Sequence, residues 1–427
     1  MYLWAQPAPA PIPASQRMVI IVSLDGLPAY ALEDPRYPMP TLRRLIREGA
    51  SVERVTTTNP AFTWPSHTSM LTGLWPAKHG VLYNGLPVRS ADSKEPVRIE
   101  PHSDKSVLVQ ATTLYDLAHQ AGLTVGHVDW VAIEHAPTVD WEFTEWGNPS
   151  GPIEKDLIAA GKLKPADLAG FDKRSMTLRD QVWTAAALDI ICKHKPNLML
   201  FHPLNLDHTH HRYGAMSEAS ETAAAFEDDR LKEILDTVEA SDLRDRTTLI
   251  VLSDHGFKNP TKTIRPNVVL KAAGIQGAFA VPEGGSAQIY ITDPARRDEL
   301  IPKVKAALAN AEGIAKIMDR TDYPALGLPD PLKNPRMGDL FVAAKDGYAF
   351  GAGSEGEPVV TSAPYGSHGY LNTDPDMDAI FVAWGYGIRR GAHLDRAAVV
   401  DVGPTVAALL GLKMGKIDGH CLTALLQ

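Results

Sequence analysis

Three apolar runs of strand length, each followed closely by an aspartate, constrain the fold of this chain more than any other feature. The runs are MVIIVSLDG at 18–26, PNLMLFHPLNLD at 196–207 and TTLIVLSDHG at 247–256. Continuous apolar runs of this length are typical of strands buried on both faces of a parallel sheet. Because the carboxyl ends of parallel strands meet at one edge, we expect an α/β fold with a site along that edge.

Helical patterns between the apolar runs support this prediction. Residues 40–48 have an apolar helical face and a stop at Gly49, and the strand expected at 50–57 completes a βαβ unit with the first run. The pattern changes between 259 and 350, where we expect a small inserted α+β subdomain within a single catalytic domain at 17–427. Further helices are predicted at 113–121, 176–193, 217–240 and 402–410, strands at 123–130 and 379–385, and a polar surface excursion at 85–106, with 134–174 unassigned.

Composition narrows the function classes. The chain has 42 Lys and Arg against 51 Asp and Glu, and a net charge of −9 argues against general nucleic-acid binding. No apolar run approaches the length of a membrane span. Cys192 and Cys421 lack a CxxC spacing and are predicted to be buried thiols, with their pairing left open.

Residues 1–16 are rich in Pro and Ala and predict a flexible leader. The leader lacks the basic start and apolar core of a full secretion signal, although it would match the stub that remains after signal removal. We therefore expect a periplasmic or secreted location, with a cytoplasmic one as the alternative.

The stretch from Thr56 to Asn84, TTTNPAFTWPSHTSMLTGLWPAKHGVLYN, predicts a helix over 65–72 that ends at Gly73. Proline is tolerated in the first helical turn, so Thr63 is predicted at the N-cap, beside free N–H groups and the positive end of the helix dipole. A phosphate is stabilised at such a position. The ordinary interpretation is that Thr63 only caps the helix. The motifs in the rest of the chain decide between this interpretation and a catalytic role.

A second set of residues has the side chains of a metal site. Carboxylate oxygens and imidazole nitrogens bind hard and borderline dications, and two neighbouring dications can clamp both oxygens of an in-line phosphoryl displacement. A four-residue spacing places Asp207 and His211 on one helix face, while His208 and His210 compete as ligands. Each motif alone is more often structural, so the combination carries the prediction. The set consists of Asp25, Asp207, His211, Asp254, His255 and His368.

Together and in this order, these motifs resemble the nucleotide pyrophosphatase/phosphodiesterase (type I phosphodiesterase) family of the alkaline phosphatase superfamily. The resemblance covers nearly the whole chain after residue 17. The family's nucleophile segment matches TWPSH at 63–67 and the TGLWPAKHGVLYN that follows, and its phosphate-binding asparagine falls on Asn84. Its strand-end aspartate matches Asp25, and its DxxxH, SDHG and GxHG motifs match 207–211, 253–256 and 366–369.

The resemblance implies an alkaline-phosphatase-like sandwich, with a mostly parallel central sheet, helices on both faces and a small inserted subdomain. It also implies two Zn²⁺ ions per chain, although other divalent metals remain open. One ion would be held by Asp25, Asp254, His255 and the Thr63 oxygen, and the other by Asp207, His211 and His368.

The same resemblance implies a mechanism. Thr63 would attack phosphorus to form a covalent phosphothreonine, which water then releases. The Asn84 amide and the Thr63 backbone N–H would stabilise the developing negative charge. The expected substrate is a small phosphodiester or a nucleotide, and the expected assembly is a monomer or homodimer.

Several alternatives remain on the same two-metal site. A phosphonoacetate hydrolase needs basic residues for the substrate carboxylate, but residues 114–144 contain no Lys or Arg. A phosphomonoesterase usually has an arginine where Asn84 offers neutral donors, and a sulfatase needs Cys or Ser at position 63. A non-catalytic metal-binding protein is the remote alternative.

Two departures from the family leave the nucleotide preference open. Trp64 stands where the family often has Phe, and its ring would stack on a base, cover an apolar substituent or pack under the loop. The family's second base-stacking tyrosine cannot be placed within 134–174. In addition, His210 replaces the usual Gly of the DxxxH segment.

Overall fold

The computed structural model describes residues 12–90 and 94–427. The leader prediction for residues 1–11 therefore lies outside the described residues. Ala14–Gln16 form a 3-10 turn (η1), and the Ile12 N–H donates to the Tyr386 hydroxyl at 3.0 Å. The start of the described chain is thus in contact with the domain.

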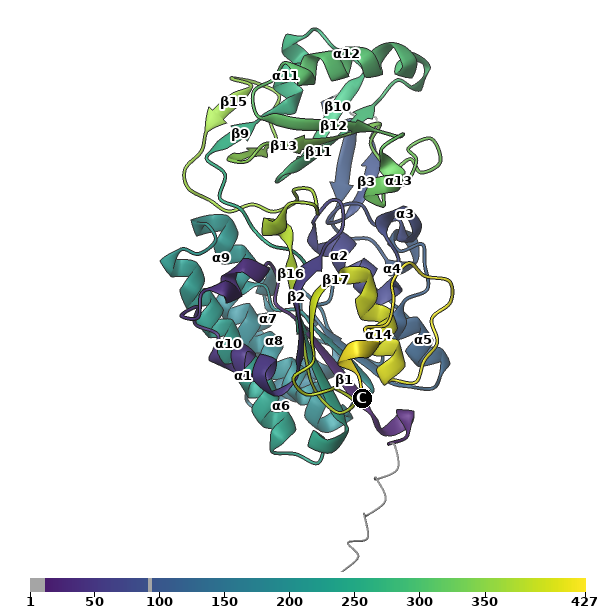
Figure 1. Ribbon diagram of the computed structural model, residues 1–427. Helices are drawn as coiled ribbons and strands as arrows, with labels where there is room; N and C mark the ends of the chain where they lie inside the picture. The colour runs from purple at the N-terminus through teal and green to yellow at the C-terminus, as the bar shows by residue number, and fades with distance from the viewer. Residues whose placement is uncertain (1–11, 91–93) are drawn as a thin grey trace, which may run out of the picture.

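The core of the fold is a mixed sheet dominated by parallel pairs (Figure 1). Among the described residues its strands run in the order β17-β2-β16-β8-β1-β7-β5-β6. Only β16 pairs antiparallel with its neighbours, which are β8 and β2. The mostly parallel α/β sheet predicted from the apolar runs is confirmed. The strands are β1 (Met18–Ser23), β2 (Ala50–Thr56), β5 (Val125–Val128), β6 (Trp141–Phe143), β7 (Leu198–Phe201), β8 (Thr247–Leu252), β16 (Ala379–Gly385) and β17 (His393–Ala398).

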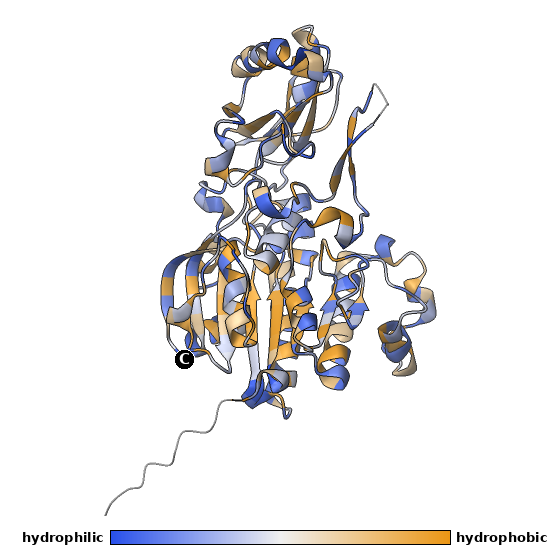
Figure 2. Ribbon diagram, turned by 90° about the vertical axis from the view of Figure 1, so that its right-hand side faces the viewer, coloured by the Kyte–Doolittle hydropathy of each residue, from blue (hydrophilic) through white to orange (hydrophobic). Residues whose placement is uncertain are grey.

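Helices cover both faces of this sheet because its central strands are apolar on both sides. On β1, Met18, Ile20 and Val22 pack into one core, and Val19 and Ile21 pack into the other. Burial of each such side chain contributes roughly 1.5–3 kcal/mol. Figure 2 shows the central strands as predominantly hydrophobic. One face carries α1 (Pro40–Glu48), α6 (Pro152–Ala159), α8 (Met176–Asp189) and α10 (Glu218–Glu239), and the other carries α2 (Thr63–Thr72), α5 (Leu114–Gln120) and α14 (Val402–Leu409).

A second, antiparallel sheet lies above the carboxyl edge of the central sheet in Figure 1. It contacts the site region, because Phe62 and Tyr83 share a hydrophobic cluster with Val281, Tyr290 and Phe341. Its strands are β10 (Ala278–Glu283), β11 (Ser286–Ile291), β13 (Leu340–Ala344) and β12 (Ile314–Asp319), accompanied by α11 (Pro266–Ala272), α12 (Arg297–Ala309) and α13 (Tyr323–Leu326). A small three-stranded sheet joins β14 (Tyr348–Phe350), β9 (Lys262–Ile264) and β15 (Val359–Thr361). The division of the chain into domains stays a prediction.

The structure refines two local predictions and shows that a third is wrong. The segment 85–106 holds a β-hairpin of β3 (Leu86–Arg89) and β4 (Val97–Glu100), followed by α4 (Lys105–Leu108). The helix predicted over 176–193 is α-helical only to Asp189 and continues as a π-helical turn, Ile190–His194. Cys192 is exposed rather than buried as predicted. Cys421 is partly exposed, and both thiols are free.

The remaining elements fill the stretch that the sequence left unassigned and the region around the site. The unassigned stretch 134–174 contains β6, α6, α7 (Pro165–Leu168) and the 3-10 turn η3 (Phe171–Lys173). Two others matter below: α3 (Pro76–His79) and α9 (Asn205–Tyr213). None of the helices in the described ranges is both long and apolar enough to cross a bilayer.

Candidate active site

The predicted site residues gather at the carboxyl edge of the central sheet. Asp25 follows β1, while Asp254 and His255 follow β8, its parallel neighbour. Asp207 and His211 lie on α9, which follows β7 on the other side of β1. The strand order therefore explains why residues far apart in the sequence meet here.

Asp25, Asp254 and His255 form a buried group at the ends of β1 and β8. His255 Nε2 lies 3.4 Å from Asp25 Oδ1 and 3.2 Å from Asp254 Oδ2. The Thr63 hydroxyl lies 3.4 Å from the same nitrogen. Four potential ligand groups thus converge on one point.

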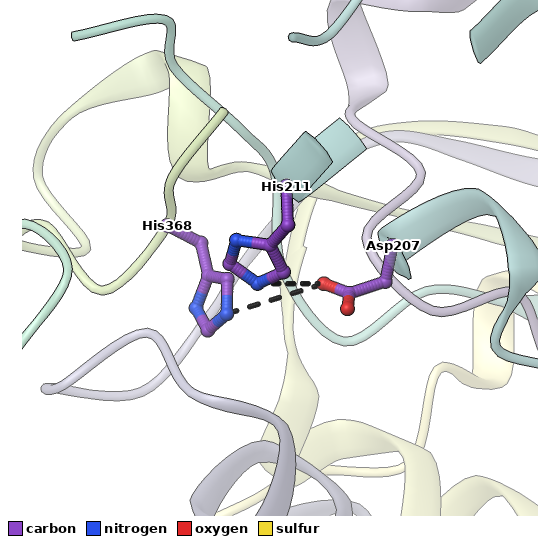
Figure 3. A group of neighbouring side chains, drawn as sticks. All are labelled: Asp207, His211 and His368. Carbon is purple, nitrogen blue, oxygen red and sulfur yellow. Dashed lines mark ion pairs between the residues drawn. The ribbon is translucent and has the colours of Figure 1, made fainter. Parts of the chain in front are cut away.

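Asp207, His211 and His368 form a second group, and their side chains point toward one another (Figure 3). Asp207 Oδ1 lies 3.5 Å from His211 Nε2 and 4.0 Å from His368 Nε2. The other ring nitrogens face backbone carbonyls, with His211 Nδ1 3.1 Å from the Gly366 oxygen and His368 Nδ1 3.0 Å from the Ala61 oxygen. Such contacts fix a histidine tautomer and leave Nε2 free to bind a metal.

The charges of both groups fit divalent cations. Three buried carboxylate oxygens, Asp25 Oδ1, Asp207 Oδ1 and Asp254 Oδ2, have no hydrogen-bond partner among the described residues. Burial, together with the charge of Asp254, raises the pKa of Asp25, and burial raises the pKa of Asp207 to about 6. Burial also lowers the pKa of His255. Neutral imidazoles and uncompensated carboxylates are the donor set that such ions bind.

The nucleophile segment differs from the prediction in one detail. Phe62, and not Thr63, is the N-cap of α2, so Thr63 is the first helical residue and Pro65 the third. Proline is tolerated here because the first-turn N–H groups have no intrahelical partner, which lets the helix begin two residues earlier than expected. The Trp64 N–H donates to Asn84 Oδ1 at 2.9 Å. The Asn84 side chain uses its oxygen in this contact, so its NH₂ group remains available to donate a hydrogen bond.

Two histidines that the sequence did not single out contact the first ligand group. His202 Nε2 lies 2.9 Å from Asp25 Oδ2, and His202 Nδ1 lies 3.0 Å from the Asp129 carbonyl oxygen. His67 Nδ1 lies 2.8 Å from the Thr63 carbonyl oxygen and 3.8 Å from Asp254 Oδ2. Burial lowers the pKa of His67 to about 3 and that of His202 to about 4, so both rings are neutral at pH 7.

A positional signal in the sequence points to His202. It directly follows β7, at the same sheet edge as Asp25 after β1. The competing histidines lie elsewhere: His208 is exposed, and His210 is buried against Phe257 with both ring nitrogens unpartnered among the described residues. Neither belongs to the two ligand groups.

Trp64 is half-buried and packs against an apolar cluster of Val81, Leu108, Val109 and Ala132. Its remaining surface lines a cavity of about 280 Å³. The opposite wall comes from residues 127–148, so the unassigned part of the sequence helps to build the space beside the nucleophile.

Comparisons with known proteins match this architecture. The family model described as type I phosphodiesterase / nucleotide pyrophosphatase matches residues 19–371. A pyrophosphatase/phosphodiesterase of Schizosaccharomyces pombe, itself uncharacterised, is 24% identical over 377 residues, covering 87% of this chain and 71% of that protein. Ectonucleotide pyrophosphatase/phosphodiesterase family member 7 of Homo sapiens is 22% identical, covering 98% and 85%. A human bis(5′-adenosyl)-triphosphatase is 21% identical, covering 92% and 78%.

Solved structures show the same fold. Murine ectonucleotide pyrophosphatase/phosphodiesterase 5, solved as an inactive variant in complex with AMP, superimposes with a TM-score of 0.75. It is 19% identical, and the match covers 96% of this chain and 100% of that chain. The human counterpart superimposes with a TM-score of 0.73. The alkaline-phosphatase-like α/β architecture expected from the sequence is therefore confirmed.

Proposed function

We propose that this chain cleaves its substrate through Thr63, because it belongs to the type I phosphodiesterase / nucleotide pyrophosphatase family. Enzymes of this family hydrolyse phosphodiester and pyrophosphate bonds. The observation that carries this proposal is the position of the Thr63 hydroxyl. It lies on the first residue of α2 and 3.4 Å from His255 Nε2, beside the buried carboxylates of Asp25 and Asp254.

We assign the two ligand groups to two zinc ions. Asp25, Asp254 and His255, with the Thr63 oxygen, would hold one ion, and Asp207, His211 and His368 would hold the other. The three partnerless carboxylate oxygens support this assignment. When bound, the ions would supply the positive charge that favours the alkoxide of a hydroxyl and that balances the phosphate.

The chain's own residues then perform the displacement. Thr63 Oγ1 attacks phosphorus and the first alcohol or phosphate leaves, which gives a phosphothreonine that still carries the second ester group. The Thr63 N–H and the Asn84 amide NH₂ donate to a non-bridging oxygen, where negative charge develops. Water attacks the same phosphorus in the second step, and Thr63 Oγ1 leaves and regains its proton.

The supporting residues keep this geometry. The contact of His202 with Asp25 and that of His67 with the Thr63 carbonyl tie the carboxylate and the helix start to the core. Because both rings are buried and neutral, they add no positive charge to the site. Charge compensation is left to the metal ions.

The neutral donor at Asn84 suits a diester better than a monoester, which carries an extra negative charge. The cavity beside Trp64 has no Lys or Arg in its lining, which disfavours the carboxylate of phosphonoacetate. The AMP in the murine complex supports nucleotides as one substrate class to test. Export and a monomeric or homodimeric state stay predictions.

One comparison tests the function. The zinc-loaded protein is assayed on a nucleoside 5′-(p-nitrophenyl phosphate), a diester, and on p-nitrophenyl phosphate, a monoester with the same leaving group. We expect kcat/KM to favour the diester by several orders of magnitude, with activity lost on chelation and restored by zinc. A preference for the monoester would reject the diesterase assignment. Full zinc loading without turnover of either substrate would indicate a non-catalytic protein.

A further inference from the structure

The helix that carries two of the three ligands of the second group has no cap of its own. α9 provides Asp207 and His211, but its N-cap residue is Leu204, whose side chain makes no capping hydrogen bond. The first N–H groups of a helix have no intrahelical partner, so an uncapped end is less stable. Asp207 lies within this first turn, so fraying of the turn would displace a ligand.

A carboxylate from α8 takes the place of the missing cap. Asp180 Oδ1 accepts from the Leu204 N–H at 3.1 Å, and Asp180 Oδ2 accepts from the Asn205 N–H at 2.7 Å. The Asp180 side chain is fully buried, and a negative charge at a helix N-terminus is stabilising. The Thr177 hydroxyl also donates to Asn205 Oδ1, at 3.4 Å. The direction of the first turn of α9 is therefore set by α8.

A second buried carboxyl group lies against this cap. Glu227 on α10 is 1% exposed and lies within hydrogen-bonding distance of the Asp180 carboxylate. Two carboxyl groups in contact in a buried site do not both ionise, so one of them holds a proton. Asp180 receives two backbone N–H groups, which favour its charged form, whereas both Glu227 oxygens lack a hydrogen-bond donor among the described residues. Glu227 is therefore the neutral acid, and it donates to Asp180.

The charges around this pair agree with that assignment. Burial raises the pKa of Glu227, and the charge of Asp180 raises it further. Arg179 and Arg230 lie near the pair and oppose the rise, but their guanidinium groups form ion pairs with other carboxylates, at 3.2 Å and 2.7 Å. Asp129 adds negative charge on the other side of Asp180, and α9 faces the pair with backbone N–H groups. The proton on Glu227 is thus what makes two buried carboxyl groups compatible here.

We propose that Asp180 and Glu227 are positioning residues for the second ligand group: Asp180 holds the first turn of α9, and the neutral Glu227 holds Asp180. The inference rests on the proposed function, since that function makes Asp207 and His211 zinc ligands. Neither member of the pair belongs to a ligand group, and both act through the start of α9.

Zinc affinity, measured by competition with a chelating dye, tests this proposal. The phase of the titration that is absent in His368→Ala identifies the ion of the second group. Asp180→Asn keeps one acceptor oxygen, but its NH₂ group would face a backbone N–H, so we expect binding of this ion to weaken about 10–100-fold while the first ion stays bound. Glu227→Gln can still donate to Asp180 and should bind like the parent. Glu227→Met cannot donate and should weaken binding as Asp180→Asn does.

The matched control is Asp228, which directly follows Glu227. It is a buried carboxylate that accepts from the Thr41 N–H at 2.8 Å and the Leu42 N–H at 2.9 Å, so it caps α1 in the same way. Because α1 carries no residue of either ligand group, Asp228→Asn should lower stability without changing zinc affinity. Equal weakening in Asp180→Asn and Asp228→Asn would overturn the proposal, as would unchanged affinity in Asp180→Asn or weakened affinity in Glu227→Gln.

Amide hydrogen exchange separates this proposal from the proposed function, because it needs neither zinc nor turnover. In the zinc-free protein we expect peptides that cover the start of α9 to exchange at least about tenfold faster in Asp180→Asn than in the parent. Peptides that cover the start of α1 should change only in Asp228→Asn. Faster exchange confined to α9 supports the cap even if the chain binds no zinc, a result that would reject the proposed function alone. Unchanged exchange at α9 overturns the cap even if diesters are hydrolysed.

Discussion

The imidazole rings of His255 and His368 stack face to face, with centroids 3.7 Å apart and planes inclined by 14°. His255 belongs to one candidate ligand group and His368 to the other, so the two groups share a wall. Burial and the neighbouring His255 lower the pKa of His368, which keeps its ring neutral and able to bind a metal. The stacked pair thus links the two candidate metal sites.

Removal of His368 should separate the two ions. In the His368→Ala variant we expect zinc content to fall from about two ions per chain to about one, because only the second group loses a ligand. Inductively coupled plasma mass spectrometry after gel filtration measures this content. His208→Ala, on the exposed side of α9, serves as control and should retain the full content. Two ions retained in His368→Ala would contradict the assignment of this residue.

Removal of the Thr63 hydroxyl should abolish turnover without removing the metals. We expect Thr63→Ala to lower kcat for the nitrophenyl diester by about 10³-fold or more, since no other group takes the nucleophile's position. Zinc content should stay nearly unchanged. Thr72→Ala, at the far end of α2, removes a hydroxyl that donates to the Thr68 carbonyl and accepts from the Leu74 N–H, and its rate should match that of the parent. Unchanged turnover in Thr63→Ala would reject the nucleophile.

The donor role of Asn84 can be tested without disturbing its structural contact. In the parent protein, the Trp64 N–H lies 2.9 Å from Asn84 Oδ1. In Asn84→Asp the side chain can still accept this hydrogen bond, but it offers a carboxylate oxygen in place of the NH₂. We expect kcat/KM for the diester to fall about 10²–10³-fold, the usual effect of losing one such donor. Steady-state kinetics at several pH values measures the loss. A change within threefold would show that Asn84 only caps the start of α2.

His202 should tune metal affinity although it is not a predicted ligand. Because its Nε2 lies 2.9 Å from Asp25 Oδ2, its loss frees that carboxylate to rotate. We expect His202→Ala to weaken zinc binding about 10–100-fold, measured by competition with a chelating dye. His210→Ala is the matched control, since His210 is equally buried but belongs to neither ligand group. Equal loss in both variants would indicate a general packing effect.

Buried His79 should make the stability of the protein depend on pH. Burial lowers its pKa to about 3, below the value of about 6.5 expected when it is unfolded. As the pH falls, His79 therefore takes up a proton in the unfolded chain before it does so in the folded one. The contribution of His79 to stability is full above pH 6.5 and declines as the pH falls toward 3. For this residue the decline is about 1.4 kcal/mol per pH unit. Urea unfolding of chelator-treated protein should show a shallower decline for His79→Gln than for the parent, and equal slopes would contradict this.

The parts of the fold that were predictable have strong local signals. The apolar run at β1 and the Pro and Gly that bound α1 led to bounds that agree with the structure, because burial and backbone restrictions act within each segment. The position of β16 was not predictable, since its sequence does not encode that it lies antiparallel between β8 and β2. The hairpin of β3 and β4 was missed because each of its strands is only 4 residues long and gives too short a pattern to detect.

The same division holds for the site. Asp25 and Asp254 were found because they end apolar strands, and both lie where that rule places them. His202 obeys the rule as well, but a histidine at a strand end has many structural roles, and only its contact with Asp25 shows its purpose. The acidic character of the cavity wall depends on how 127–148 fold against Trp64, which no local pattern conveys.

The place of β16 in the sheet has a consequence for synthesis on the ribosome. Until residues 379–385 have emerged, β8 and β2 cannot acquire the partner that lies between them, so their facing edges stay unpaired in the nascent chain. Such edges are prone to aggregate. His368 emerges only shortly before β16, so zinc cannot complete the second group early enough to protect the growing chain. We therefore expect the nascent chain to be most prone to aggregation between the synthesis of β8 and that of β16.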